Sequence, residues 1–361
     1  MRYAREAIQK MSAYVPGEQP DTREYLKLNT NENPFPPSLR VCEALRGSLL
    51  SEAIVRYPPP LCDALRNTVS QVYSVPPEWI AVGNGSDELL NLVFRVILNP
   101  GDKVAYPVPT YSLYRTLAQI QEAEPVEIPF PEDFTLPERF LNTSSYLKVV
   151  CNPNSPTGTV VSQDILVRLL ESADCPVLID EAYADFAPYN ALPLLFRYPH
   201  LLVARTLSKS FSFAGLRVGL LFAQPELLSG ILKIKDSYNV NNLSQIAAIA
   251  ALGDLDAMQC NVQAIRATRD RFSRAMEERG FYVYPSQANF VLVRKEGRSL
   301  ASLYESLKKE KIMVRYFPSL PDCLRISIGL DRDMDRLIDT IDTLLDQDGR
   351  KNVQAFHLGS G

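Results

Sequence analysis

Three short apolar segments decide the expected fold: Tyr146–Cys151 (YLKVVC), Cys175–Asp180 (CPVLID) and Leu201–Thr206 (LLVART). Each has the length and composition of a buried strand, and helix-like segments such as Ser162–Ser172 separate them. Short buried strands that alternate with helices indicate a mostly parallel sheet with helices on both faces. Ligands bind such sheets beyond the carboxyl ends of the strands. We therefore expect an α/β protein whose functional residues follow these three segments.

Composition divides the 361 residues into four regions. Residues 1–40, rich in Pro, Asn and charge, are expected to form an N-terminal arm that packs with a smaller domain. Residues 41–255 form a large domain that contains the three segments, and residues 256–347 form a smaller α+β domain. A long helical stretch from about Leu243 to Gly280 is expected to connect the two domains. Residues 348–361 are expected to form a polar, frayed tail.

The charge and apolar content exclude several classes of protein. A net charge of -4 argues against a nucleic-acid partner, which needs a basic surface. No apolar run approaches the roughly 20 residues that span a bilayer, and Met1–Lys10 lacks the apolar core of a signal peptide. With only two histidines and no ligand motif near either, we expect no metal site. These features predict a cytoplasmic protein that binds small molecules.

Polar motifs follow each of the three segments. They are Asn152–Gly158 (NPNSPTG), Asp180–Tyr183 (DEAY) and Leu207–Lys209 (LSK), and two glycine-containing stretches flank them, Gly83–Asp87 (GNGSD) and Gly215–Gly219 (GLRVG). Alone, each is weak evidence. A lysine after a strand is usually a surface charge, a glycine-rich helix start is usually a turn and cap, and an aspartate can simply pair with an arginine.

Together, these residues supply what pyridoxal 5′-phosphate requires of a protein. The amine of Lys209 can form a Schiff base with it, and the Asp180 carboxylate can keep the pyridine nitrogen protonated. Tyr183 and Asn154 can hydrogen-bond the ring oxygen, while Tyr111 can stack on the ring. The phosphate requires backbone N–H groups at a helix start, hydroxyls and a guanidinium, and the candidates are Gly85, Ser86, Asp87, Thr206, Ser208 and Arg217.

The motifs also carry a family resemblance over nearly the whole chain. The chain resembles the fold-type-I aminotransferases in Gly85-Ser86, Pro156-Thr157-Gly158, Asp180-x-x-Tyr183, Ser208-Lys209 and Gly215-x-Arg217-x-Gly219. Within that group it is similar to the histidinol-phosphate aminotransferases in Leu28–Pro34 (LNTNENP), Arg56-Tyr57-Pro58 and Leu324–Gly329 (LRISIG). The resemblance implies an enzyme of histidine biosynthesis that converts histidinol phosphate and 2-oxoglutarate into imidazole acetol phosphate and glutamate.

The resemblance also implies a homodimer and a substrate site. Tyr57 would reach the cofactor phosphate of the neighbouring subunit, although by itself it reads as a turn residue before three prolines. Substrate recognition falls to Tyr14, Arg315 and Arg325, and each arginine could otherwise form a surface ion pair. Two guanidiniums suit a phosphate ester, and Arg325 would also bind the α-carboxylate of glutamate.

One position departs from the family pattern. The asparagine that usually precedes Pro-Thr-Gly is replaced by Ser155. Three alternatives remain: a shifted loop brings Asn154 to the ring oxygen, Ser155 serves there more weakly, or Tyr183 acts alone. Separately, Arg217 and the cofactor ring are expected to lower the pKa of Lys209.

Other functions are compatible with parts of the pattern. An aromatic amino-acid aminotransferase or a phosphothreonine-type decarboxylase would use similar residues. A cofactor-binding regulator is less favoured because no basic helix-turn-helix segment precedes the core. A nucleotide-binding oxidoreductase would rest on Gly83-x-Gly85, but Glu88 stands where the third glycine is required.

Overall fold

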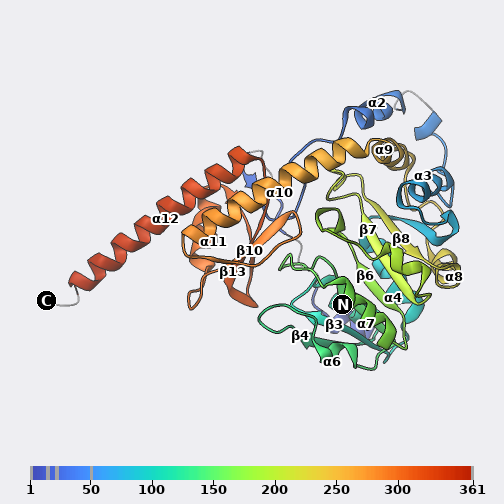
Figure 1. Ribbon diagram of the computed structural model, residues 1–361, viewed down its shortest axis with the longest axis horizontal. Coiled ribbons are helices and arrows are strands. Elements are labelled where there is room, and N and C mark those ends of the chain that lie inside the picture. The colour runs from blue at the N-terminus through green and yellow to red at the C-terminus, as the bar shows by residue number, and fades with distance from the viewer. Residues whose placement is uncertain (1–2, 14–16, 21–23, 49–51, 359–361) are drawn as a thin grey trace.

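The computed structural model describes residues 3–13, 17–20, 24–48 and 52–358. Its centre is a seven-stranded sheet in the order β2-β8-β7-β6-β5-β3-β4 (Figure 1). In chain order these strands are β2 Ile80–Asn84, β3 Lys103–Val108, β4 Glu124–Pro129, β5 Leu147–Cys151, β6 Val177–Asp180, β7 Leu201–Thr206 and β8 Val218–Ala223. Strands β3 to β7 pair in parallel, and β8 runs antiparallel to both of its neighbours. The three segments read from the sequence are therefore adjacent strands, and the predicted fold is confirmed.

Both faces of the sheet are covered by helices, which explains why its central strands β5 to β8 are buried along their whole length. Alternate residues serve opposite faces: Val177 and Ile179 belong to one core cluster, while Leu178 between them belongs to the other. The first cluster includes side chains of α3 Asp63–Tyr73, α7 Gln163–Ser172 and α9 Asn242–Leu252. The second includes side chains of α4 Ser86–Ile97, α5 Leu113–Ile120 and α8 Pro225–Ile234.

A smaller antiparallel sheet lies at the other end of α10 Leu255–Glu278, which runs between the two parts (Figure 1). Its order is β12-β13-β10-β9, with the bounds β9 Tyr282–Val283, β10 Phe290–Arg294, β12 Arg315–Phe317 and β13 Leu320–Ser327. Two further helices pack around it, α11 Ala301–Lys309 and α12 Asp331–Leu358. The segment 348–358, expected to be a frayed tail, continues α12, and the C-terminal part of this helix extends away from the small sheet (Figure 1). None of the helices in the described ranges is both long and apolar enough to cross a membrane.

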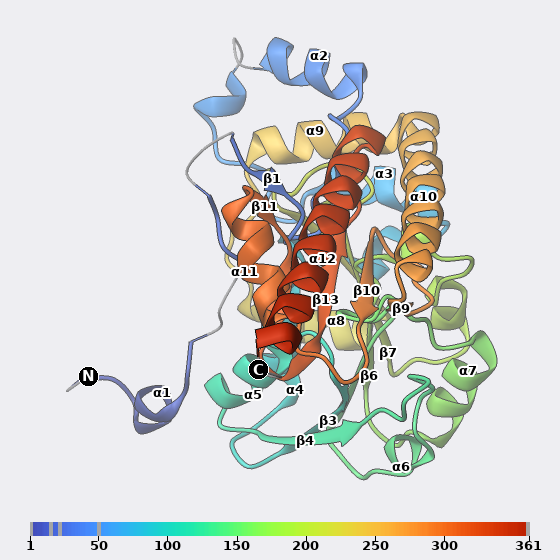
Figure 2. The same cartoon turned by 90° about the vertical axis from the view of Figure 1, so that its left-hand side faces the viewer.

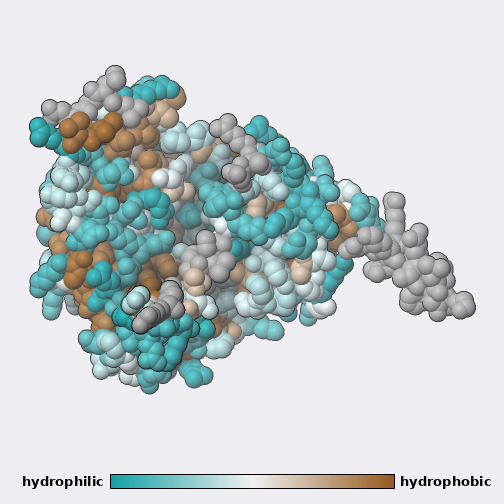
Figure 3. Space-filling view, turned by 180° about the vertical axis from the view of Figure 1, so that it is seen from behind, coloured by the Kyte–Doolittle hydropathy of each residue, from teal (hydrophilic) through white to brown (hydrophobic). Residues whose placement is uncertain are grey.

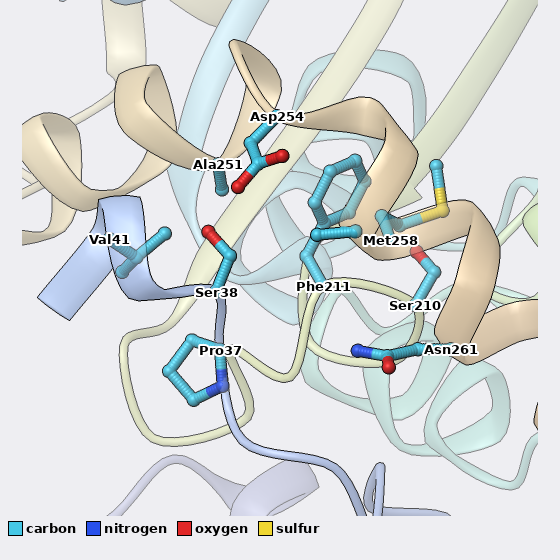
Figure 4. Close-up of a pocket in the computed structure, with 10 residues that line it drawn as sticks. Pro37, Ser38, Val41, Ser210, Phe211, Ala251, Asp254, Met258 and Asn261 are labelled. Carbon is cyan, nitrogen blue, oxygen red and sulfur yellow. The ribbon is translucent and has the colours of Figure 1, made fainter.

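The helical stretch expected from about Leu243 to Gly280 consists of two helices, because Gly253 and Asp254 separate α9 from α10. Asp254 has φ -137 and ψ 55, outside the helical region, and the Arg40 guanidinium binds the carbonyl oxygen of Gly253 at 2.6 Å. Figure 4 shows Ser38, which precedes α2 Leu39–Ser48, facing this break across a cavity of about 20 Å³. The cavity has room for roughly one water molecule.

The arm adds a strand to the small part of the molecule. β1 Leu26–Lys27 pairs in parallel with β11 Ile312–Met313, and Figure 2 shows the two side by side. The pairing continues beyond the strand, where the Leu28 N–H donates to the Met313 carbonyl and the Ser327 N–H donates to the Leu28 carbonyl. The residues that follow, 29–33, are thereby held between the small sheet and the carboxyl edge of the large one.

Candidate active site

A cavity of about 1020 Å³ opens at the carboxyl ends of the central strands. The large sheet, the arm and the small sheet all contribute to its walls. Eleven of the residues singled out from the sequence line it: Ser86, Asp87, Tyr111, Asp180, Tyr183, Thr206, Ser208, Lys209, Arg217, Arg315 and Arg325. Residues more than 200 positions apart thus meet at the edge of the sheet where strand topology places ligands.

Lys209 follows β7, and its amine lies against the arm. The Nζ donates to the Thr30 carbonyl at 3.3 Å and lies 5.7 Å from the centre of the Tyr183 ring. Burial, followed by the positive charge of Arg325, lowers the pKa of Lys209 to about 8, and Arg217 contributes less. The expected direction is therefore found, but its main cause is desolvation. A lysine with a lowered pKa is nucleophilic near neutral pH.

Asp180 is the last residue of β6 and is buried. Its Oδ2 accepts a hydrogen bond from the Tyr114 hydroxyl at 2.7 Å, and its Oδ1 accepts one from the Ala182 N–H at 3.2 Å. Desolvation raises the pKa of Asp180 to about 6, so the carboxylate is still ionised at neutral pH. Within the described part of the chain it forms no ion pair. A buried carboxylate of this kind favours a cationic ligand atom.

Hydroxyls and a guanidinium gather at the start of α4. Arg217 lies 3.5 Å from Asp87 and donates to the Ser208 Oγ at 3.3 Å, and the Ser208 N–H donates to the Thr206 Oγ1 at 3.1 Å. The first turn of α4, with Ser86 and Asp87, faces the same space. Helix N–H groups together with a guanidinium form a site for a phosphate.

Two glycines make this arrangement possible. A Cβ at Gly219 would lie 2.4 Å from the carbonyl carbon of Gly85 and 2.5 Å from the backbone nitrogen of Ser86. Gly85 itself has φ +82, and a Cβ there would lie 2.2 Å from Arg217 Nη2. Because β8 packs directly on the backbone before α4, side chains at either position would displace the phosphate-binding groups.

Two tyrosines, Tyr183 and Tyr111, line the cavity. The Tyr183 hydroxyl accepts a hydrogen bond from Asn31 Nδ2 at 2.9 Å, and its ring packs edge-on against Phe290. The Tyr111 hydroxyl donates to Asp87 Oδ1 at 3.2 Å, and its ring contacts Tyr114 at 86°. Both tyrosines line the cavity, and their roles at the ring oxygen and on the ring face stay predictions.

Arg315 and Arg325 are direct partners in the pairing of β12 with β13. Their guanidinium carbons lie 5.4 Å and 5.6 Å from the centre of the Phe317 ring, and Arg325 also lies over Phe290. Arg325 donates to the Ser155 Oγ at 3.0 Å and to the Asn29 carbonyl at 2.9 Å. The small sheet thus presents two guanidiniums to the cavity, as an anionic substrate requires.

Asn154 and Tyr57, which were also singled out from the sequence, do not line this cavity, and Tyr57 was expected at the site of the neighbouring subunit. Asn154 is buried behind the wall, where its side chain binds Thr110, the Pro109 carbonyl and Thr157. Tyr57 is 79% exposed and stacks on Tyr238, away from the cavity. Tyr14 lies outside the described residues.

The arm contributes side chains to which sequence reasoning assigned no role. Besides the contacts of Thr30 and Asn31, Asn33 Nδ2 donates to the Lys209 carbonyl at 2.8 Å. In the sequence, Leu28–Pro34 stands out for its resemblance to a family motif and for its three asparagines. The asparagines are the local sign of a role for this segment, because asparagine side chains often stabilise irregular backbone.

These groups fit pyridoxal 5′-phosphate. The pyridinium nitrogen would complement the buried charge of Asp180, the phosphate would take the glycine-backed donors at α4, and the aldehyde would take the Lys209 amine. No cluster of His, Cys, Asp and Glu able to hold a metal ion occurs among the residues that the structure describes.

Comparison with known proteins defines the class. The family model for aminotransferases of class I and II matches residues 23–341. The chain therefore belongs to the class I and II aminotransferases, and its cofactor is pyridoxal 5′-phosphate.

Within this class, the similar curated relatives are histidinol-phosphate aminotransferases. The enzyme of that name from Rhodopirellula baltica is 44% identical over 93% of each chain. Histidinol-phosphate aminotransferase 1 from Nostoc sp. is 42% identical over 95% of this chain and 98% of its own. The resemblance read from the motifs is thereby confirmed.

Solved structures agree on the fold. Histidinol-phosphate aminotransferase from Sinorhizobium meliloti, in complex with pyridoxal-5′-phosphate, has a TM-score of 0.85 at 24% identity, over 95% of this chain and 99% of that one. Aspartate aminotransferase from Thermus thermophilus with maleate has a TM-score of 0.81 at 21% identity, over 94% and 99%. Because enzymes with different substrates share the fold, substrate choice must be argued from the site.

Proposed function

We propose that the protein transfers the amino group of histidinol phosphate to 2-oxoglutarate, giving imidazole acetol phosphate and glutamate in cytoplasmic histidine biosynthesis. The similarity to histidinol-phosphate aminotransferases supports this reaction. The single observation that carries it is the pairing of Arg315 with Arg325 at the cavity wall. Histidinol phosphate has no α-carboxylate and bears a phosphate ester instead, so two adjacent guanidiniums suit it better than one.

Arg325 has to serve both half-reactions. In the second it binds the α-carboxylate of glutamate, for which a planar guanidinium fork is well matched. Its contacts with Ser155 and the Asn29 carbonyl fix the direction of the fork before substrate arrives. Such fixation reduces the conformational entropy lost on binding.

The remaining residues divide the work of holding the cofactor. When bound, pyridoxal 5′-phosphate supplies an aldehyde for the amino group and a ring that accepts an electron pair from the substrate carbon. Asp180 would keep the ring nitrogen protonated, Tyr183 would donate to the ring oxygen, and Tyr111 would stack on the ring. The start of α4, Thr206, Ser208 and Arg217 would hold the phosphate.

Lys209 attaches the cofactor and then acts as the general base. Its amine would hold the aldehyde of the cofactor and, when free, would carry a proton away from the substrate carbon that bears the nitrogen. A lysine pKa of about 8 leaves a useful fraction of neutral amine at physiological pH.

The test mixes the purified protein with histidinol phosphate and follows the visible absorption band of the cofactor, then adds 2-oxoglutarate. We expect the band to be lost with the first addition and restored with the second. No response to histidinol phosphate would refute the substrate assignment. A stronger response to phenylalanine would favour an aromatic amino-acid aminotransferase, and release of carbon dioxide from a phosphorylated amino acid would favour a decarboxylase.

We also propose a homodimer in which Tyr57 completes the partner's phosphate site. Tyr57 is accompanied by other exposed apolar side chains, Leu39, Ile54, Val55 and Leu61, near α2 and α3. Brown surface at the upper left of Figure 3 marks the end of the molecule that carries α2. Clustered exposed apolar residues of this kind are typical of protein interfaces.

Mixing two inactive variants tests this dimer. Subunits with Lys209→Ala lack the amine, and subunits with Tyr57→Ala lack the crossing tyrosine. In a mixed dimer one of the two sites has both residues, so random mixing should restore about a quarter of the wild-type activity. If mixing restores nothing while both variants still dimerise, Tyr57 does not cross to the partner.

A further inference from the structure

A closed set of hydrogen bonds joins the small sheet to the cofactor side of the cavity through Asn31. The Asn31 N–H donates to Ser327 Oγ at 2.8 Å, and that hydroxyl donates to Asn31 Oδ1 at 3.0 Å. Asn31 Nδ2 then donates to the Tyr183 hydroxyl at 2.9 Å. Asn31 and Ser327 are each 2% exposed, and Tyr183 is 8% exposed.

These bonds settle which way the Asn31 amide points. Because the Ser327 hydroxyl already accepts the Asn31 N–H, it has its own hydrogen to give, and Asn31 Oδ1 lies in position to accept it. The NH₂ end of the amide must therefore face Tyr183. This removes the usual ambiguity between the oxygen and nitrogen of an asparagine side chain.

The direction of the Tyr183 O–H bond follows. Because its oxygen accepts the hydrogen bond from Asn31, the Tyr183 hydroxyl must point its own hydrogen away from Asn31. Tyr183 lines the cavity, so that hydrogen is available to a ligand there. Burial raises the pKa of Tyr183 to about 12, so the hydroxyl keeps this hydrogen at any pH at which the protein works. Asn154, the other side chain considered for the ring oxygen, is fully engaged behind the wall.

We propose that Asn31 is a positioning residue that fixes Tyr183 as the hydrogen-bond donor to the ring oxygen of pyridoxal 5′-phosphate. The inference rests on the proposed role of Tyr183 in the cofactor site. It also gives the arm a function, since Ser327 lies two residues beyond Arg325 on β13. Strand β13, which carries Arg325, therefore also carries Ser327, the residue that orients Asn31 and, through it, the Tyr183 hydroxyl.

The backbone of Asn31 makes a clean substitution possible. Its φ is +55, in the left-handed region that asparagine and aspartate tolerate better than other residues with a side chain. Asn31→Asp keeps this conformation and still offers an oxygen to Ser327. Its other oxygen, however, accepts the Tyr183 hydrogen and turns it away from the ring oxygen.

The measurement is the pH midpoint at which the visible band of the bound cofactor changes. A donor at the ring oxygen stabilises the less protonated form of the bound cofactor, so its loss raises the midpoint. The charged groups around Lys209 and Tyr183 that also influence the midpoint are Asp87, Asp180, Glu32, Arg217 and Arg325. All of these stay unchanged in the variants.

A double-mutant cycle separates the hydrogen bond from the added charge of aspartate. In a Tyr183→Phe background, Asn31→Asp can act only through its charge. With Tyr183 present, we expect an additional rise of about one to two pH units, the size expected for one hydrogen bond to a charged oxygen. Ser327→Ala, which frees the Asn31 amide to rotate, is expected to raise the midpoint by a smaller amount.

Asn289→Ala is the matched control. Asn289 Nδ2 donates to the Asn31 carbonyl at 3.0 Å, so its loss loosens the same loop without touching Tyr183. We expect its midpoint to stay at the wild-type value. Equal shifts by Asn31→Asp with and without Tyr183, or a shift by Asn289→Ala as large as the additional rise, would overturn the inference. Absence of a visible band in the wild-type protein would instead overturn the cofactor site itself.

Discussion

Replacing Lys209 with methionine is expected to stabilise the cofactor-free protein at neutral pH. The charged amine is poorly solvated where it lies, and burial lowers its pKa from 10.5 to about 8. In the unfolded chain the lysine regains its ordinary pKa. Between about pH 8 and 10.5 the unfolded state therefore binds more protons than the folded state, and stability rises with pH.

The size of the effect follows from the two pKa values. At 1.36 kcal/mol per pH unit, the full shift destabilises the folded state by about 3 kcal/mol below pH 8. Lys209 is only half-buried, and its amine borders the cavity, so solvent screens part of this. We expect the variant to be more stable than the wild type by about 1.5 to 3 kcal/mol near pH 7.

Urea denaturation of both cofactor-free proteins at about pH 7 and about pH 10.5 provides the assay. At the higher pH the advantage of the variant should nearly vanish, because the wild-type lysine is then neutral in the folded state. All other titrating groups are common to both proteins, so they cancel in the difference. A difference that is equal at the two pH values would refute a lowered lysine pKa.

Three further substitutions test the rest of the site. Arg325→Lys removes the planar fork and the bond to Ser155, and steady-state kinetics should show the KM for histidinol phosphate rising about 10- to 100-fold; an unchanged KM would move phosphate binding elsewhere. Gly219→Ala places a Cβ 2.4 Å from a backbone carbon, so spectroscopic titration should show cofactor affinity falling about tenfold or more, whereas Gly215→Ala, with nothing within 4 Å, should bind normally. Asp180→Asn cannot hold a proton on the ring nitrogen, and we expect kcat to fall by about 10²-fold or more with the thermal midpoint little changed; near-normal kcat would contradict this role.

The large sheet could be predicted from the sequence because its central strands are mostly apolar. Short, mainly apolar runs are typical of strands buried on both faces, and the segments at 146–151, 175–180 and 201–206 are such runs, with Lys148 and Arg205 as buried exceptions. Strand β8, Val218–Ala223, was not among the expected strands although it is equally apolar, because its first residues were assigned to the Gly215–Gly219 motif; its antiparallel direction depends on how the chain turns between Thr206 and Val218. Likewise, the break at Gly253 and Asp254 could not be located, since a helical pattern continues on both sides of it.

The position of a side chain at the cavity was predictable where it depends on following a strand, as for Asp180 and Lys209. It was not predictable where function depends on a contact between distant residues. Asn31 bonds to Tyr183 across 152 positions and to Ser327 across 296, and no local pattern encodes either contact. The case of Asn154 is similar, because only the folded loop reveals that its side chain turns away from the cavity.

The arginines of this protein show how the fold separates structural charges from functional ones. Arg205, buried behind the site, is paired with the Glu181 carboxylate at 3.1 Å, so its charge is neutralised. Arg315 and Arg325 instead lie opposite each other on the adjacent strands β12 and β13, where like charges repel. Both guanidiniums lie near the Phe317 ring. Aromatic rings attract a guanidinium by about 0.5 to 2 kcal/mol without cancelling its charge. The ring contacts thus offset part of the repulsion between the two guanidiniums, and a phosphate ester bound between them would offset more of it.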